Sequence, residues 1–185
     1  MHKLIILSGP GGCGKDTIIE RLLKERNLKL SKLVNATSRP KREGEIDGEN
    51  YHFVSKEQFQ KMIENRDLLE YEVMSATGQF YGTLKNALEN QLQKSDVVCN
   101  KMPVGALELK KYFSTDCITI FIDADDIELR QRLSESIRKN STDDIEKRIE
   151  QGQKERVYAN QFDYQLFNHD GELEKVVNEI IRIIS

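Results

Sequence analysis

Ten residues near the N-terminus have types and spacing suited to binding phosphate. The segment Ser8-Gly9-Pro10-Gly11-Gly12-Cys13-Gly14-Lys15-Asp16-Thr17 matches G-x-x-x-x-G-K, with the glycines at Gly9 and Gly14. Glycine allows backbone N–H groups to turn toward phosphate oxygens, because no Cβ blocks the required backbone angles. The positive end of a following helix would add to the attraction, and the Lys15 ammonium can reach the β- and γ-phosphates. The segment is therefore predicted to be a phosphate-binding loop.

The residue after the lysine departs from the usual pattern. A serine or threonine is common there because its hydroxyl holds Mg²⁺, whereas this chain has Asp16 followed by Thr17. A carboxylate can hold the ion through a bridging water, or the hydroxyl role can pass to Thr17. Asp16 and Thr17 are both expected near the metal, and the sequence leaves the choice between them open.

A second group of charged residues, from Arg39 to Tyr51, can bind another anion. Arg39 and Arg42 lie three residues apart on a polar loop and can together hold a dianionic phosphate through charge-assisted hydrogen bonds. Tyr51 can add a hydroxyl donor, and Glu45 can either orient the arginines or be a solvated loop charge. Alone, the arginines fit a basic surface loop equally well. Beside a phosphate-binding loop, they favour a second phosphate site.

Alternating strands and helices must position these two loops. The apolar run 4–7 is a predicted strand, and residues 15–26 are a predicted amphipathic helix. Further strands are expected at 33–37, 51–54, 68–74, 97–99, 118–122 and 163–167. Further helices are expected at about 55–65, 83–94, 103–113, from 125 onward, 141–160 and 171–185. This order predicts an α/β fold with a parallel sheet covered by helices on both faces.

Several local signals fix the ends of these elements. Ser55 and Gln58 form a capping-box pattern, and Pro103 suits the first turn of a helix. The polar segment 141–144 is also expected to open a helix. Residues 78–83 are predicted to form a turn whose Thr83 caps the next helix.

Length and composition indicate one compact domain. The chain has 185 residues and a net charge of −3, which gives no sign of general nucleic-acid binding. Its three cysteines are widely separated, which fits a reduced cytoplasmic protein better than a disulfide framework or a zinc site. No apolar run is long enough to span a membrane, and no leader segment is expected. Small-molecule partners are expected, with a monomer or homodimer as the assembly.

The motifs together resemble those of guanylate kinases along nearly the whole chain. The family pattern S-G-P-x-G-x-G-K occurs as residues 8–15, and T-[TS]-R-x-P-R-x-G-E-x-D-G-x-x-Y occurs as residues 37–51 with its proline displaced by one position. Leu69-Glu70-Tyr71 resembles the F-L-E-Y segment, and Tyr81-Gly82-Thr83 resembles Y-Y-G-T. The resemblance implies a P-loop NTPase-type sheet of residues 1–32, 84–124 and 160–185. It also implies an inserted lobe that binds the nucleoside monophosphate (33–83) and a helical lid region (125–159).

The resemblance further implies an enzyme that uses ATP and Mg²⁺ to phosphorylate GMP and dGMP to GDP and dGDP. The residues expected to bind ATP are Gly9, Pro10, Gly11, Gly12, Cys13, Gly14, Lys15, Asp16, Thr17 and Asn168. Those expected to bind GMP are Asn35, Arg39, Arg42, Tyr51, Glu70, Tyr81 and Thr83. Those expected to act on the transferring phosphoryl group are Lys15, Arg39, Arg132, Arg138 and Arg148.

The base-binding part of the sequence departs from the family. The third core strand of the family usually ends in I-D-V-Q-G preceded by an acid, whereas this chain has Asn100 and Met102 at the two acidic positions. Asn35 likewise replaces a serine near the base. A pocket with Glu70 and no second acid is expected to discriminate guanine less strongly.

A monophosphate kinase with altered base specificity remains an alternative, and so do two other functions. The segment from Gly14 to Asp16 and the strand end at Asn100 resemble ribose 1,5-bisphosphate phosphokinase, a relative on the same fold that phosphorylates a sugar phosphate. The other alternative is a non-catalytic binding module, like the guanylate-kinase-like domains of scaffold proteins. Lys15 argues against the second alternative, because such modules are expected to lack a working phosphate-binding loop.

Overall fold

A five-stranded parallel sheet forms the centre of the molecule. The computed structural model describes residues 2–74, 77–135 and 141–185. The strand order is β2 (Leu30–Lys32), β7 (Asp96–Asn100), β1 (Leu4–Ser8), β8 (Cys117–Asp123) and β9 (Tyr164–Phe167). All four strand pairs are parallel. The middle strand β1 is buried along its whole length, as expected of a strand covered on both faces.

Helices cover both faces of this sheet because side chains alternate along each strand. Ile5 and Leu7 of β1 belong to a core shared with α1 (Lys15–Leu23), α7 (Leu173–Ile184), α5 (Asp126–Glu135) and α6 (Thr142–Arg156). Leu4 and Ile6 point to the other face and belong to a core shared with α3 (Lys85–Leu92) and α4 (Pro103–Phe113). The predicted α/β architecture is confirmed.

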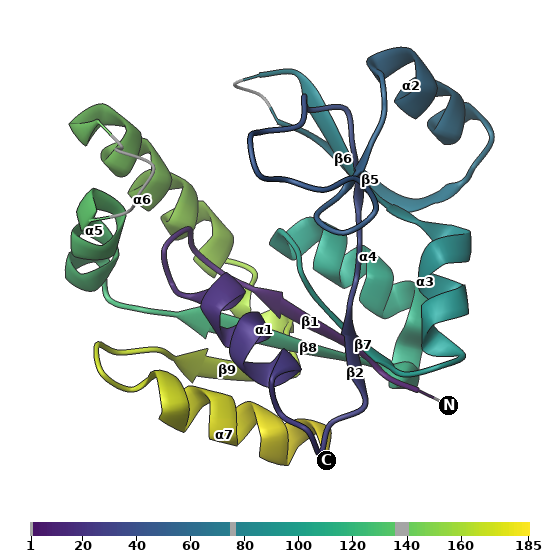
Figure 1. Ribbon diagram of the computed structural model, residues 1–185. Helices are drawn as coiled ribbons and strands as arrows, with labels where there is room; N and C mark the ends of the chain where they lie inside the picture. The colour runs from purple at the N-terminus through teal and green to yellow at the C-terminus, as the bar shows by residue number, and fades with distance from the viewer. Residues whose placement is uncertain (1, 75–76, 136–140) are drawn as a thin grey trace.

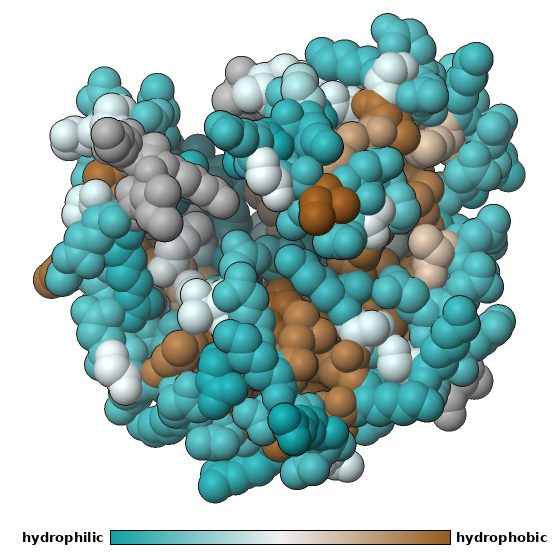
Figure 2. All heavy atoms as spheres, viewed as in Figure 1, coloured by the Kyte–Doolittle hydropathy of each residue, from teal (hydrophilic) through white to brown (hydrophobic). Residues whose placement is uncertain are grey.

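A second, smaller sheet lies beyond one edge of the central layer (Figure 1). Its strand order is β4 (His52–Phe53), β3 (Ala36–Thr37), β6 (Gln79–Leu84) and β5 (Leu68–Met74), and α2 (Lys56–Glu64) packs against it. α5 and α6 lie on the opposite side of the phosphate-binding loop, and the surface is hollowed between the two parts (Figure 2). The functional division into monophosphate lobe and lid stays a prediction.

Most predicted elements are present, and the clearest errors concern the small sheet. The predicted turn at 78–83 is wrong, because these residues belong largely to β6, which pairs with β3 and β5. Thr83 does not cap α3, whose N-cap is Leu84. Of the predicted strand 33–37, only Ala36–Thr37 (β3) is a strand, because residues 33–35 carry the chain from β2 of the large sheet to the small sheet.

Two predicted helices end earlier than expected, and two predicted starts are confirmed. α1 stops at Leu23, and α6 stops at Arg156 before a short 3₁₀ turn at Ala159–Gln161. The Ser55–Gln58 capping box is present, and α4 spans the predicted range 103–113. Among the described residues, no helix combines the length and apolar character needed to cross a bilayer.

Candidate active site

The phosphate-binding loop connects β1 to α1 and is fixed by close backbone packing. Gly9 has φ +129°, and a Cβ built there would lie 1.9 Å from the carbonyl oxygen of Ile122 in β8. Gly14 has φ +95°, and a Cβ there would lie 2.6 Å from Nδ2 of Asn168. Both positions therefore require glycine, in conformation and in space. The loop backbone has one specific path because the sheet and the C-terminal segment press against it.

Lys15 and Asn168 both contact the loop itself. Lys15 Nζ donates to the carbonyl oxygens of Gly9 at 2.5 Å and Pro10 at 2.9 Å. Asn168 is buried and donates from Nδ2 to the carbonyl oxygen of Cys13 at 2.9 Å. The structure thus places Asn168 as a residue that holds the loop in shape. Its predicted contact with adenine stays a prediction.

Two of the three predicted lid arginines face the loop. A cavity is shared by Arg132 of α5, Arg148 of α6 and the loop residues Gly11, Gly12, Gly14 and Lys15. Arg132 donates to Asp170 and to the carbonyl oxygen of Asn168, but its buried Nη1 has no hydrogen-bond partner among the residues that the structure describes. This arrangement directs positive charge toward the loop from α5 and α6. Arg138, the third predicted arginine, lies outside the described residues.

Asp16 and Thr17 are exposed at the start of α1, in the same cavity. Asn100 at the end of β7 donates from Nδ2 to Asp16 Oδ1 at 2.7 Å. The carboxylate and the amide thus meet at the carboxyl ends of the strands, where the usual motif has a hydroxyl after the lysine and an acid at the position of Asn100. Carboxylate, amide and hydroxyl oxygens are the hard donors that Mg²⁺ prefers, so this set fits the ion.

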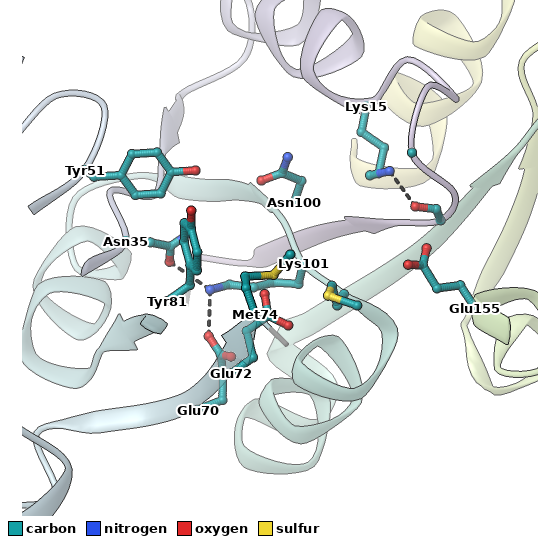
Figure 3. Close-up of a pocket in the computed structure, with 13 residues that line it drawn as sticks. Lys15, Asn35, Tyr51, Glu70, Glu72, Met74, Tyr81, Asn100, Lys101 and Glu155 are labelled. Carbon is teal, nitrogen blue, oxygen red and sulfur yellow. Dashed lines mark hydrogen bonds and ion pairs between the residues drawn. The ribbon is translucent and has the colours of Figure 1, made fainter. Parts of the chain in front are cut away.

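A second cavity extends from the phosphate-binding loop to the small sheet (Figure 3). It is lined by Gly9, Gly11, Lys15, Asn35, Tyr51, Glu70, Glu72, Met74, Tyr81, Asn100, Lys101, Met102 and Glu155. The rings of Tyr51 and Tyr81 pack edge to face, with centroids 5.9 Å apart. The structure therefore places predicted donor-site and acceptor-site residues on one continuous cavity.

Lys101 is the largest surprise in this cavity. Its Nζ lies 2.6 Å from Glu70 Oε1, 2.8 Å from Asn35 Oδ1 and 2.5 Å from Thr83 Oγ1, and only 8% of its side chain is exposed. The three residues expected to face the guanine base are thus all bound to one ammonium group. Sequence reasoning missed Lys101, although a charged residue directly after a parallel strand is where open α/β sheets bind ligands.

The arginines of the 39–51 loop do not line the cavity. Arg39 is buried and makes a bidentate contact with Glu45, at 2.9 Å from Nη1 and 2.6 Å from Nη2. Its guanidinium also lies 5.4 Å from the ring centroid of Tyr51. Hydrogen bonds from Arg39 lower the pKa of Glu45 to about 2, and Glu45 in turn raises the pKa of Arg39. Arg42 is exposed, and its backbone N–H donates to Glu45. Of the two readings of Glu45, the structure favours the one in which it orients Arg39.

Two further carboxyl groups line this second cavity and were not anticipated. Burial raises the pKa of Glu155, which is on the cavity-facing side of α6. Burial, and to a lesser degree the charge of Glu70, raises the pKa of Glu72. Neither residue has a local sequence signal, because only the tertiary fold brings them to the wall of this cavity.

Arg156 is another residue that the sequence did not single out. It makes hydrogen bonds from Nε and Nη2 to the Asp123 carboxylate, from Nη1 to Asp126, and from Nη2 to the carbonyl oxygen of Ala124. These bonds raise the pKa of Arg156. They attach the C-terminal end of α6 to the end of β8 and to the start of α5, so Arg156 helps to position α6 beside the cavity.

The comparisons with known proteins agree with this geometry. The family model described as guanylate kinase matches residues 1–185. The chain belongs to the guanylate kinase family. It is 41% identical over 175 residues to a guanylate kinase of Porphyromonas gingivalis, covering 92% of this chain and 90% of that relative. It is 42% identical over 178 residues to a guanylate kinase of Bacteroides thetaiotaomicron, covering 94% of this chain and 84% of the relative.

A solved structure gives the same fold. The crystal structure of guanylate kinase from Anaplasma phagocytophilum superposes with a TM-score of 0.74 over 99% of this chain and 84% of that chain, at 23% identity. The P-loop NTPase-type fold expected from the sequence is therefore confirmed.

Proposed function

We propose that this protein transfers the γ-phosphoryl group of ATP to the phosphate of GMP or dGMP, giving GDP or dGDP. The observation that supports the proposal best is the single cavity lined by both the phosphate-binding loop and the tyrosine pair Tyr51 and Tyr81. In-line transfer between two nucleotides needs donor and acceptor phosphates in one enclosed space. Family membership supports the same reaction.

The proposed chemistry depends on positioning and on charge. The acceptor phosphate is already a competent nucleophile, so no strong general base is required. Lys15, Arg132 and Arg148 would neutralise the charge on the transferring group. Lys15 presently donates to the carbonyl oxygens of Gly9 and Pro10, and its ammonium would exchange these for phosphate oxygens. Arg132 would use its Nη1, which has no partner in the described part of the chain, while Asp170 holds the rest of the guanidinium.

The acceptor phosphate would be held by Tyr51, Tyr81, Arg39 and Arg42. Arg39 is ion-paired with Glu45, which fixes the guanidinium next to the Tyr51 ring. Closing of the small sheet toward the phosphate-binding loop would bring this group to the cavity and exclude water. Residues 33–83 are thus proposed as the monophosphate-binding lobe and residues 125–159 as the lid region.

Mg²⁺ is proposed to bind near Asp16 and Thr17. When bound, the ion supplies charge neutralisation between the phosphates. The role of Asn100 would be to orient the Asp16 carboxylate through their 2.7 Å hydrogen bond. A cytoplasmic location is also proposed, supported by three cysteines that are all free and buried.

ADP release in a coupled assay, with several acceptors under identical conditions, tests the proposal. We expect clear preference for GMP and dGMP over AMP and UMP. Lys15→Met should abolish turnover, whereas Lys24→Met, a matched change on the exposed end of the same helix, should leave it unchanged. Equal use of AMP and GMP would contradict the guanine assignment. No ADP with any acceptor would favour a binding module.

Ribose 1,5-bisphosphate belongs in the same assay as the second candidate acceptor. The observation that favours it is that Glu70, the carboxylate expected to read guanine, is bound to Lys101 and Thr83. Preference for the sugar bisphosphate over GMP would overturn the proposed function and leave the fold and the donor site intact.

A further inference from the structure

Lys101 places a positive charge in the cavity wall where the base of the acceptor is expected. The residue follows β7 directly, and its side chain extends toward β5 and β6 of the small sheet (Figure 3). An ammonium group has three N–H donors, and here they have three acceptors, in Glu70, Asn35 and Thr83. Lys101 lines the cavity even though 8% of its side chain is exposed, so its exposed part faces the cavity.

Glu70 is held in place from both of its oxygens. Oε1 accepts hydrogen bonds from Lys101 at 2.6 Å and from the Thr83 hydroxyl at 2.5 Å. Oε2 packs against the first turn of α4, where a Cβ built on Gly105 would lie 2.8 Å from it. The carboxylate therefore has little freedom to turn away from the ammonium. The wall presents a fixed cation beside a fixed anion in place of an isolated acid.

We propose that Lys101 is a specificity-determining residue that donates a hydrogen bond to the 6-oxo group of the acceptor base. This inference rests on the proposed function and adds to it the feature of the base that is read. On binding, the ammonium would exchange one neutral acceptor, the Asn35 amide oxygen, for the base oxygen and remain paired with Glu70.

The ammonium of Lys101 beside the carboxylate of Glu70 complements the edge of a 6-oxopurine and does not complement the edge of adenine. Guanine and hypoxanthine carry an acceptor, O6, next to a donor, N1–H, which matches an ammonium next to a carboxylate. Adenine carries the reverse, an amino group next to an acceptor nitrogen, so it would set donor against donor. Met102 lines the cavity where a second acid was expected and has no acceptor for the 2-amino group. The site should therefore discriminate by the 6-position more than by the 2-position.

Three monophosphates that differ at one edge of the base test this inference. GMP and IMP differ in the 2-amino group, and 2-aminopurine riboside monophosphate lacks the 6-oxo group and the N1–H. The measurement is kcat/KM for each, with ATP as donor, for the wild type and for Lys101→Met. In the wild type, we expect kcat/KM to be about tenfold or more lower for the 2-aminopurine nucleotide, which lacks the 6-oxo group, than for IMP, which lacks only the 2-amino group.

Lys101→Met isolates the contribution of the lysine. The gap between GMP and the 2-aminopurine nucleotide should shrink about tenfold, while the gap between GMP and IMP stays within a factor of about two. Lys85→Met is the matched control, because this lysine lies over the Tyr112 ring outside the cavity. It should leave all three ratios at their wild-type values. Circular dichroism checks folding, and Lys101→Ala, which also lacks a donor and leaves room for water beside Glu70, replaces the methionine variant if that variant is unfolded.

Each outcome is decisive. If Lys101→Met lowers kcat/KM by the same factor for all three nucleotides, the lysine has a purely structural role and the inference is overturned. Values of kcat/KM that do not change for any of the three nucleotides would overturn the inference too. If neither variant folds, the wild-type order alone decides, and a larger loss for IMP than for the 2-aminopurine nucleotide refutes the inference. Wild-type protein that consumes ATP only with a sugar bisphosphate would instead refute the proposed function.

Discussion

Removing the charge of Lys101 should strongly destabilise the native state. Lys101 and Glu70 lie 2.6 Å apart, with 8% and 4% of their side chains exposed, so neither charge is well solvated. Replacing Lys101 by methionine keeps the volume and leaves the Glu70 carboxylate buried without its cation. Breaking a buried ion pair in this way costs about 3–5 kcal/mol of unfolding free energy, a large share of the roughly 5–15 kcal/mol that stabilises a domain.

Urea unfolding followed by circular dichroism measures this loss. Lys154→Met is the control, because the Lys154–Glu150 pair is 67% and 66% exposed and should contribute less than about 1 kcal/mol. The double variant Lys101→Met with Glu70→Gln should recover most of the loss, because no unpaired charge remains. A loss below about 1 kcal/mol for Lys101→Met, equal to that of the control, would show that the pair is solvated and that the reasoning is wrong.

Three further predictions concern the loops. Gly9→Ala should abolish ATP binding, because the added Cβ would lie 1.9 Å from a β8 carbonyl oxygen. Gly44→Ala is the control: this glycine has φ +81° and open space around it, so the change should lower the free energy of unfolding by only about 1 kcal/mol in a thermal unfolding experiment. Asn168→Ala removes a buried hydrogen bond to the phosphate-binding loop and should raise the KM for ATP, with about 1–2 kcal/mol lost in urea unfolding; an unchanged KM would contradict its role. The Glu45 carboxyl, with a pKa of about 2 when folded, should stabilise the protein fully above its ordinary pKa of 4.5 and lose that effect as the pH falls toward 2. The stability gap between wild type and Glu45→Gln should then close at low pH, and a gap independent of pH would show that the ion pair with Arg39 is not its source.

Local signals were sufficient for four of the five strands of the large sheet and for several helix starts. The Ser55–Gln58 capping box and Pro103 at the start of α4 act within a few residues, so the sequence shows them directly. The spacing of Gly9, Gly14 and Lys15 likewise placed the phosphate-binding loop between β1 and α1. Such features depend on neighbours in sequence, and for that reason they could be predicted.

The small sheet and the Lys101 contact depend on partners far away in the chain. Residues 78–83 contain two glycines and resemble a turn, but pairing with β3 and β5 makes most of them a strand. Lys101 meets Glu70 across 31 positions of sequence, and no local pattern marks a lysine as the partner of a buried acid. Tertiary packing decides both cases, because it alone sets which backbone edges and which charges meet.

Because all three thiols of this protein are buried, their reactivity can be used to measure local opening of the structure. Cys13 lies in the phosphate-binding loop, and Cys99 and Cys117 lie in β7 and β8, the two strands that flank β1. Burial raises the pKa of each thiol. A disulfide reagent can modify such a group only when the surrounding structure opens. The rate of Cys13 labelling therefore reports how often the phosphate-binding loop opens. ATP should slow the labelling of Cys13 more than it slows the labelling of Cys117.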